Sequence, residues 1–112
     1  MPFARIGSFD VSPNKLTSVV ELFRDWITPA FASLNGFLGY QAFVDEVTGR
    51  YIGISYWASQ AALEDSTDTA HRARCEAEAL GAQIIGEPIS CRQQFDTRSA
   101  SPPAASLSSS PS

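Results

Sequence analysis

The sequence predicts one α+β domain, a four-stranded antiparallel sheet with two helical segments in the chain order β-α-β-β-α-β. The first observation is a hairpin, because two aromatic-rich runs, residues 37–44 and 50–57, flank a turn that contains Thr48-Gly49. The second is its position between two segments of helical periodicity. The third is a short strand candidate near each end of the domain. Helices in this order are expected to form one layer on the sheet.

The first strand, residues 3–9, is followed by a helix that ends at Asn35-Gly36 in a left-handed turn. Ser12 is expected to cap this helix, with proline at its first position. Pro29 is expected to kink the helix or end its first part, because proline lacks an amide hydrogen. The apolar residues recur at spacings of three and four, as in an amphipathic helix on an apolar surface: Leu16, Val19, Val20, Phe23, Trp26, Ile27, Ala30, Phe31 and Leu34.

Both hairpin strands are apolar on both faces. One face would carry Leu38, Tyr40, Ala42 and Val44 with Ile52, Ile54 and Tyr56; the other would carry Phe37, Gly39 and Phe43 with Tyr51, Gly53, Ser55 and Trp57. A sheet of this kind cannot leave one side in water, and two helices can cover only one side. The other side is expected to meet a second copy of the chain, which predicts a homodimer with Tyr40 and Tyr56 at its interface.

The second helical region runs from Gln60 to about Leu80, with Ser59 as its cap and Gly81 after its end. Weak helix formers at residues 66–69 predict a break. A last strand is expected over residues 83–96, with a bulge or an edge at Pro88. Residues 97–112 are rich in serine, proline and alanine and are expected to form a disordered tail, so the domain would span residues 1–96.

Composition narrows the classes of function. The chain has 112 residues and a net charge of −4, which argues against nucleic acid and anionic membranes as partners. No apolar run approaches the ~20 residues of a membrane span, and no secretory signal is visible, so a cytoplasmic location is expected. Cys75 and Cys91 are expected to be small buried residues. With one histidine in the chain, no metal site and no cofactor are expected.

Two segments carry a family resemblance. Asn35-Gly36-Phe37-Leu38-Gly39 and Ser55-Tyr56-Trp57-Ala58-Ser59-Gln60-Ala61-Ala62-Leu63 resemble the antibiotic biosynthesis monooxygenase domain. The resemblance spans about residues 3–96 and implies a ferredoxin-like subunit that pairs into a dimeric α+β barrel. Families on this frame include cofactor-free quinone-forming monooxygenases, haem-degrading oxygenases, isomerases of small signalling molecules and proteins with no assigned activity.

The resemblance assigns only part of a catalytic set. Trp57 matches the strand-end tryptophan of the quinone-forming members. Where those members place an asparagine four residues earlier and a tyrosine six residues later, this chain has Gly53 and Leu63. Arg74 or Arg72 could match their arginine. For the haem-degrading members, the helix tryptophan falls at Ser66, and only His71 could stand in for the haem ligand.

The candidate catalytic residues are Trp57, Arg74 and His71, and each also has a structural interpretation. Trp57 could stack on an aromatic substrate or anchor the core. His71 could act as a general base or haem ligand, or face solvent beside its arginine neighbours. Arg74 and Arg72 could hold a phenolate or carboxylate, or form a solvated helix face.

The expected walls of a substrate cleft are Tyr51, Ser55, Phe23 and Ile27, with Arg72 as a further binding residue. Arg5 is either an edge residue or a pocket cation. The leading hypothesis is a cofactor-independent monooxygenase-like enzyme acting on a polycyclic or phenolic aromatic molecule. A non-catalytic, dimeric ligand-binding or stress-associated protein of the same fold is the alternative, and a haem-binding or haem-degrading protein is the third.

Overall fold

The structure, a computed structural model, describes residues 2–98. Most of the predicted tail, from residue 99 onward, lies outside the described residues. The elements are β1 (Phe3–Asp10), a 3₁₀ turn η1 (Pro13–Lys15), α1 (Leu16–Leu22), a π-helical turn η2 (Phe23–Ile27), α2 (Thr28–Ala32), β2 (Phe37–Asp45), β3 (Arg50–Trp57), α3 (Gln60–Asp65), α4 (Thr67–Ala79), β4 (Gln83–Ile84) and β5 (Ile89–Arg92). This order confirms the predicted α+β fold with an antiparallel sheet.

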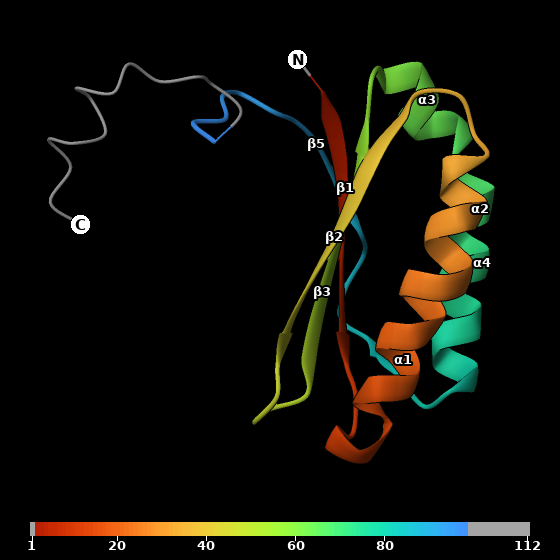
Figure 1. Cartoon of the computed structure of the whole chain (residues 1–112), viewed down its shortest axis with the longest axis vertical. Coiled ribbons are helices and arrows are strands. Elements are labelled where there is room, and N and C mark those ends of the chain that lie inside the picture. The colour runs from red at the N-terminus through yellow and green to blue at the C-terminus, as the bar shows by residue number, and fades with distance from the viewer. Residues whose placement is uncertain (1, 99–112) are drawn as a thin grey trace, which may run out of the picture.

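All helices lie on one side of the sheet (Figure 1). The strand order is β2-β3-β1, and β4 and β5 both pair with the free edge of β1. The prediction of one strand over residues 83–96 is therefore wrong. The strand divides around Gly86, whose φ is +67°, and Pro88, which has no amide hydrogen to donate to a ladder.

The first helical segment widens before Pro29 rather than ending there. In the π turn, the Thr28 amide donates to the Phe23 carbonyl five residues earlier, and α2 continues from Thr28. Ser12 precedes the first turn, but its hydroxyl makes no capping hydrogen bond, contrary to expectation. Gly36 ends the segment at a φ of +84°, as predicted.

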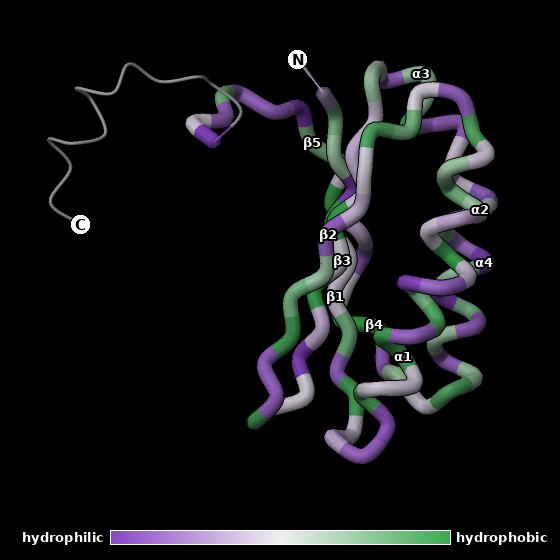
Figure 2. Tube along the Cα trace, in the orientation of Figure 1, coloured by the Kyte–Doolittle hydropathy of each residue, from purple (hydrophilic) through white to green (hydrophobic). Residues whose placement is uncertain are grey.

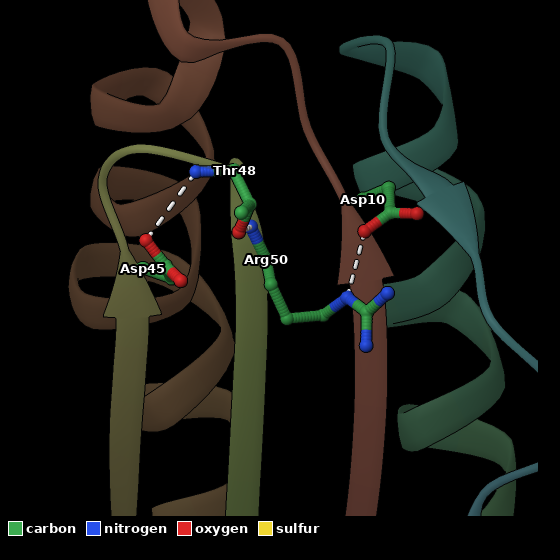
Figure 3. Close-up of polar contacts among 4 residues, drawn as sticks. All are labelled: Asp10, Asp45, Thr48 and Arg50. Atoms are coloured by element: carbon green, nitrogen blue, oxygen red, sulfur yellow. Dashed lines mark hydrogen bonds and ion pairs between the residues drawn. The ribbon is translucent and has the colours of Figure 1, made fainter.

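The hairpin turn follows its sequence signal. Gly49 has a φ of +84°, and an added Cβ there would collide with the Val11 carbonyl oxygen. The Asp45 carboxylate accepts from the Thr48 amide at 3.3 Å (Figure 3). Arg50 then pairs with Asp10 on the neighbouring β1, Nε to Oδ1 at 2.7 Å.

The second helical region also follows its sequence. The Ser59 hydroxyl accepts from the Ala62 amide and caps α3, as predicted. The predicted break is present at Ser66, between α3 and α4. Gly81, with a φ of +104°, follows the end of α4.

A β-bulge in β2 changes one predicted face. The register with β3 shifts between Phe37 and Gly39, so that Tyr40 lies opposite Ser55 and turns toward the helices. The expectation that Tyr40, Ala42 and Val44 belong to the uncovered side is therefore wrong. Gly39 and Phe43, which were expected on the side of Trp57, lie on the uncovered side, because every position of β2 after the bulge changes side. Tyr56 keeps its predicted place on that side, where its hydroxyl donates to Gln41 Oε1 at 2.7 Å.

The hydrophobic core lies between the sheet and the helices. Its largest fully buried side chains are Trp57 and Tyr51 from β3, with Val19 from α1. On the opposite side of the sheet, Leu38, Phe43 and Ile89 remain 57%, 54% and 60% exposed. The apolar strand segments visible in Figure 2 therefore have a helical cover on one side only.

The two cysteines differ from expectation in their exposure. Cys75 and Cys91 are exposed free thiols, so the expectation that both are buried is wrong. Cys75 lies on the outer side of α4 and Cys91 lies on β5 at the sheet edge.

Among residues 2–98, no helix combines the length and apolar character needed to cross a bilayer.

Candidate active site between sheet and helices

A small cavity lies between the sheet and α4. Its volume is about 40 Å³, which is room for a few water molecules. Aromatic rings supply much of its wall, and two guanidinium groups supply its charge. The lining residues are Arg5, Gly7, Phe9, Phe23, Phe31, Tyr40, Gly53, Ser55, Ala70, Ala73, Arg74 and Pro88.

Arg5 enters this cavity from the helix-facing side of β1. Its Nη1 donates to Ser66 Oγ at 2.7 Å, and its Nη2 donates to the Leu63 carbonyl at 2.9 Å and to Thr67 Oγ1 at 3.3 Å. These acceptors lie at the junction of α3 and α4. Burial, and then the nearby charge of Arg74, lower the pKa of the Arg5 guanidinium. Arg5 is therefore a cation of the pocket rather than an edge residue.

The three candidate site residues on α4, Arg74, Arg72 and His71, lie in different surroundings. Arg74 is half-buried and lines the cavity, whereas Arg72 is exposed and does not. His71 is exposed and lines a neighbouring surface groove, where its Nδ1 lies 3.5 Å from Arg74 Nη2. The helix therefore brings one of the three side chains into the cavity wall.

Tyr40 and Tyr51 form a hydroxyl pair beside the cavity, with their oxygens 2.9 Å apart. The Tyr40 ring stacks on Phe23, with ring centroids 5.9 Å apart. Burial is the main reason that the pKa of each tyrosine hydroxyl is raised, and the pKa of Tyr51 rises to about 12. An added Cβ at Gly53 would collide with the Tyr40 hydroxyl. Tyr40 thus occupies the space next to the position where the family resemblance expects an asparagine side chain.

Trp57 lies behind this wall rather than in it. The indole is fully buried, and its Nε1 donates to Ser55 Oγ at 2.9 Å. It packs edge-on against Phe31 and Phe37, with centroids 5.5 and 5.3 Å away. The structure supports its interpretation as a core anchor, with Ser55 as the group through which it reaches the cavity.

Of the predicted cleft residues, the structure brings Phe23, Ser55 and Arg74 into the cavity wall. Tyr51 stands behind Tyr40, and Ile27 is buried in the core without lining the cavity. The prediction missed Tyr40 because the bulge in β2 leaves no clear trace in the sequence. Alternation along β1 was a usable signal for Arg5, which shares a face with Phe3 and Phe9.

Substituting Gly53 with alanine is expected to lower the free energy of unfolding by about 2 kcal/mol, because the new methyl group displaces the Tyr40 hydroxyl. Gly7→Ala is the matched control, since Gly7 faces Gly53 across the ladder and its added Cβ meets no atom within 4 Å. Urea unfolding measures both. Combining Gly53→Ala with Tyr40→Phe should cost about 1 kcal/mol less than the sum of the single changes. Equal losses at the two glycines would contradict this packing.

Alkaline pH is expected to destabilise the fold through Tyr40 and Tyr51. Folding raises both pKa values above the ordinary 10.0, so their stabilising contribution is complete below that pH. It is lost as the pH rises from there toward about 12, the raised pKa of Tyr51. Urea unfolding across this range should show a shallower decline for the Tyr40→Phe, Tyr51→Phe double variant than for the unchanged protein. Parallel declines would rule out this coupling.

Comparison with known proteins supports the fold. The family model of antibiotic biosynthesis monooxygenases matches residues 2–78. No curated protein matches the chain. Among solved structures, Rv0793 from Mycobacterium tuberculosis has a TM-score of 0.61 at 15% identity, covering 86% of this chain and 97% of that chain.

Two further structures come from Streptomyces. A variant of SnoaB, a cofactor-independent oxygenase from Streptomyces nogalater, has a TM-score of 0.65 at 15% identity and covers 86% and 96% of the two chains. The ActVA-Orf6 monooxygenase from Streptomyces coelicolor, solved with the ligand nanaomycin D, has a TM-score of 0.60 at 19% identity and covers 84% and 89%. Structural similarity at such low sequence identity establishes the fold of this chain and not its function. Because the family model matches well over half of the residues, this chain belongs to the antibiotic biosynthesis monooxygenase family.

Proposed function

We propose that this protein is a monooxygenase-like enzyme that binds a phenolic, preferably polycyclic, aromatic molecule between the sheet and α4 and needs no cofactor. The observation that carries the proposal is the half-buried Arg74 in a cavity walled by Phe9, Phe23 and Phe31. Aromatic walls suit a flat ring, and a guanidinium suits the phenolate oxygen that such a ring exposes.

In the proposed reaction, the substrate supplies all the electrons. A phenolate ring carbon gives electrons to O₂; one oxygen atom becomes a quinone oxygen and the other leaves as water. One hydrogen of that water comes from the reacting ring carbon, and the other is a proton from solvent, which replaces the proton that the phenol lost on ionisation. Arg74 would stabilise the phenolate, which is the electron-rich form. His71 lies outside the cavity, so this scheme gives it no role as a general base.

A ring cannot enter the cavity in the described conformation, because about 40 Å³ holds only a few waters. The proposal therefore includes an opening step. Tyr40 is the side chain best placed for it, because it covers Gly53 and lines the cavity. Rotation of Tyr40, or a small shift of α4 past its alanine contacts, would enlarge the site.

We also propose a homodimer formed through the uncovered side of the sheet. Its apolar residues are Leu38, Phe43, Ile52, Ile54, Tyr56, Ile6 and Ile89, of which Leu38, Phe43 and Ile89 are more than half exposed. Large apolar side chains exposed together on one side of a sheet favour association in water. The exposed thiols of Cys75 and Cys91 support a reducing, cytoplasmic setting.

A non-catalytic ligand-binding protein is the second candidate. Two observations favour it: Trp57 is fully buried, and among residues 2–98 no carboxylate or imidazole lines the cavity to accept a proton. Haem degradation receives no support, because the single histidine of the chain lies outside the cavity.

Turnover separates these candidates. Metal-free protein with a hydroxyanthrone under air should consume O₂ and form quinone, with Arg74→Gln lowering kcat/KM at least about tenfold through lost charge-assisted binding. Arg72→Gln is the matched control, because it removes the same charge from the exposed side of α4 and should leave the rate unchanged. Tight binding without quinone formation would favour the non-catalytic candidate.

The dimer is tested by native mass spectrometry at micromolar concentration. Phe43→Glu places a charge on the uncovered side of the sheet and should convert dimer to monomer. Trp26→Glu is the control, since Trp26 is also an exposed aromatic residue (73%) but lies on the helical segment. A monomeric unchanged protein, or equal effects of the two substitutions, would refute an interface on the sheet.

A further inference from the structure

Two guanidinium groups meet in one cavity from opposite layers. Arg5 comes from β1 and Arg74 from α4, and both line the cavity. They are close enough for the charge of Arg74 to lower the pKa of Arg5, after the larger effect of burial. Two like charges held together in a partly dry space repel each other, and an anion between them would relieve that repulsion.

Within residues 2–98, no carboxylate forms an ion pair with either guanidinium. The ion pairs there join Arg24 to Asp25, Arg50 to Asp10 and Arg98 to Asp96. Glu78 and Glu87 line the neighbouring groove together with Arg74, but beyond ion-pair distance. The net charge of the whole chain is −4, so the cavity is a local exception to an acidic protein.

Arg5 is held in place while keeping donors free. Its three hydrogen bonds to Ser66, Leu63 and Thr67 use three of its five N–H groups. The Nε–H has no hydrogen-bond partner among the described residues. Every fully buried side-chain nitrogen or oxygen in that part of the chain has such a partner, so Nε is not fully buried. The Nε–H is therefore accessible to solvent or to a ligand.

The other polar side chains of the wall add donors as well. The Tyr40 and Tyr51 hydroxyls share one hydrogen bond. When Tyr51, which stands behind the wall, donates in that bond, the proton of Tyr40 remains available to a ligand. Ser55 Oγ accepts from the Trp57 indole, which leaves the Ser55 proton free to donate. In the described part of the chain, the polar side chains of the wall thus offer hydrogen-bond donors and no carboxylate or imidazole acceptor.

We infer that Arg5 and Arg74 form a two-guanidinium clamp for an aromatic ligand that enters already ionised, through a carboxylate or phenolate oxygen. Arg5 is the residue that sets this preference, because its position is fixed by the α3–α4 junction whereas Arg74 borders the open groove. The inference rests on the proposed function and narrows it: the protein selects the anion and does not need to remove the proton.

The test compares charged probes with neutral ones of the same shape by calorimetric titration of the full-length protein. The carboxylate pair is 2-naphthoate and 2-naphthamide. The phenolate pair is 4-nitrophenolate, above the pKa of its phenol, and 4-nitroanisole. Each anion should bind about 10- to 100-fold more tightly than its neutral partner, the range expected of charge-assisted hydrogen bonds. The pair with the larger ratio identifies the favoured acid.

Variants assign the effect to the clamp. Arg5→Gln and Arg74→Gln should each lower the anion-to-neutral ratio about tenfold. Arg5→Lys, which keeps the charge if Arg5→Gln fails to fold, should lower it by less. The matched controls are Arg50→Gln on β3 and Arg72→Gln on α4, which remove the same charge outside the cavity and should leave the ratio within about twofold. A loosened fold would weaken both probes of a pair together, so the ratio isolates recognition.

Equal binding of anions and neutral partners would overturn the clamp, as would equal losses in Arg72→Gln and Arg74→Gln, or no binding of any probe. The clamp and the proposed enzyme can fail separately. Anion preference without quinone formation from the hydroxyanthrone would keep the clamp and remove the oxygenase. Quinone formation without anion preference would keep the oxygenase and remove the clamp.

Discussion

The contact between the Tyr40 hydroxyl and Gly53 is the constraint on which the cavity depends. Because Gly53 has no side chain, Tyr40 can lie over the neighbouring strand β3 and reach Tyr51 on that strand. Its ring then stacks on Phe23, which ties the sheet to the first helical segment. Tyr40 also lines the cavity, whose volume is about 40 Å³. In the proposed function, stability and ligand access would therefore be coupled through one side chain.

A one-sided helical cover is the second constraint. Two helical segments bury one face of the sheet, and the alternation along β3 places Tyr51, Ser55 and Trp57 on that face. The opposite face keeps its apolar side chains without a cover from any helix within residues 2–98. The proposed dimer and the cavity thus follow from the same alternation, and they occupy opposite sides of one sheet.

The charges of the cavity are costly to bury without a partner. Arg5 meets part of this cost by donating to Ser66 and the Leu63 carbonyl, and these bonds also join β1 to the α3–α4 junction. A cation with both a structural and a recognition role is harder to replace than a surface arginine.

Some of this structure was determined locally by the sequence. The hairpin turn at Gly49, the cap at Ser59 and the break at Ser66 depend on backbone preferences and nearest neighbours, and each is found where its residues predict it. The period of two along β3 likewise placed Tyr51, Ser55 and Trp57 on the buried face.

Only the tertiary structure decided which side chains meet. Tyr40 changed faces because a bulge, visible only in the register with β3, shifted it by one position. Arg74 rather than Arg72 entered the cavity because the packing of α4 on the sheet sets the rotation of the helix. The last strand divided where Pro88 could not donate to β1. Register and helix rotation depend on contacts between residues far apart in the chain, and the local patterns of a sequence do not reveal those contacts.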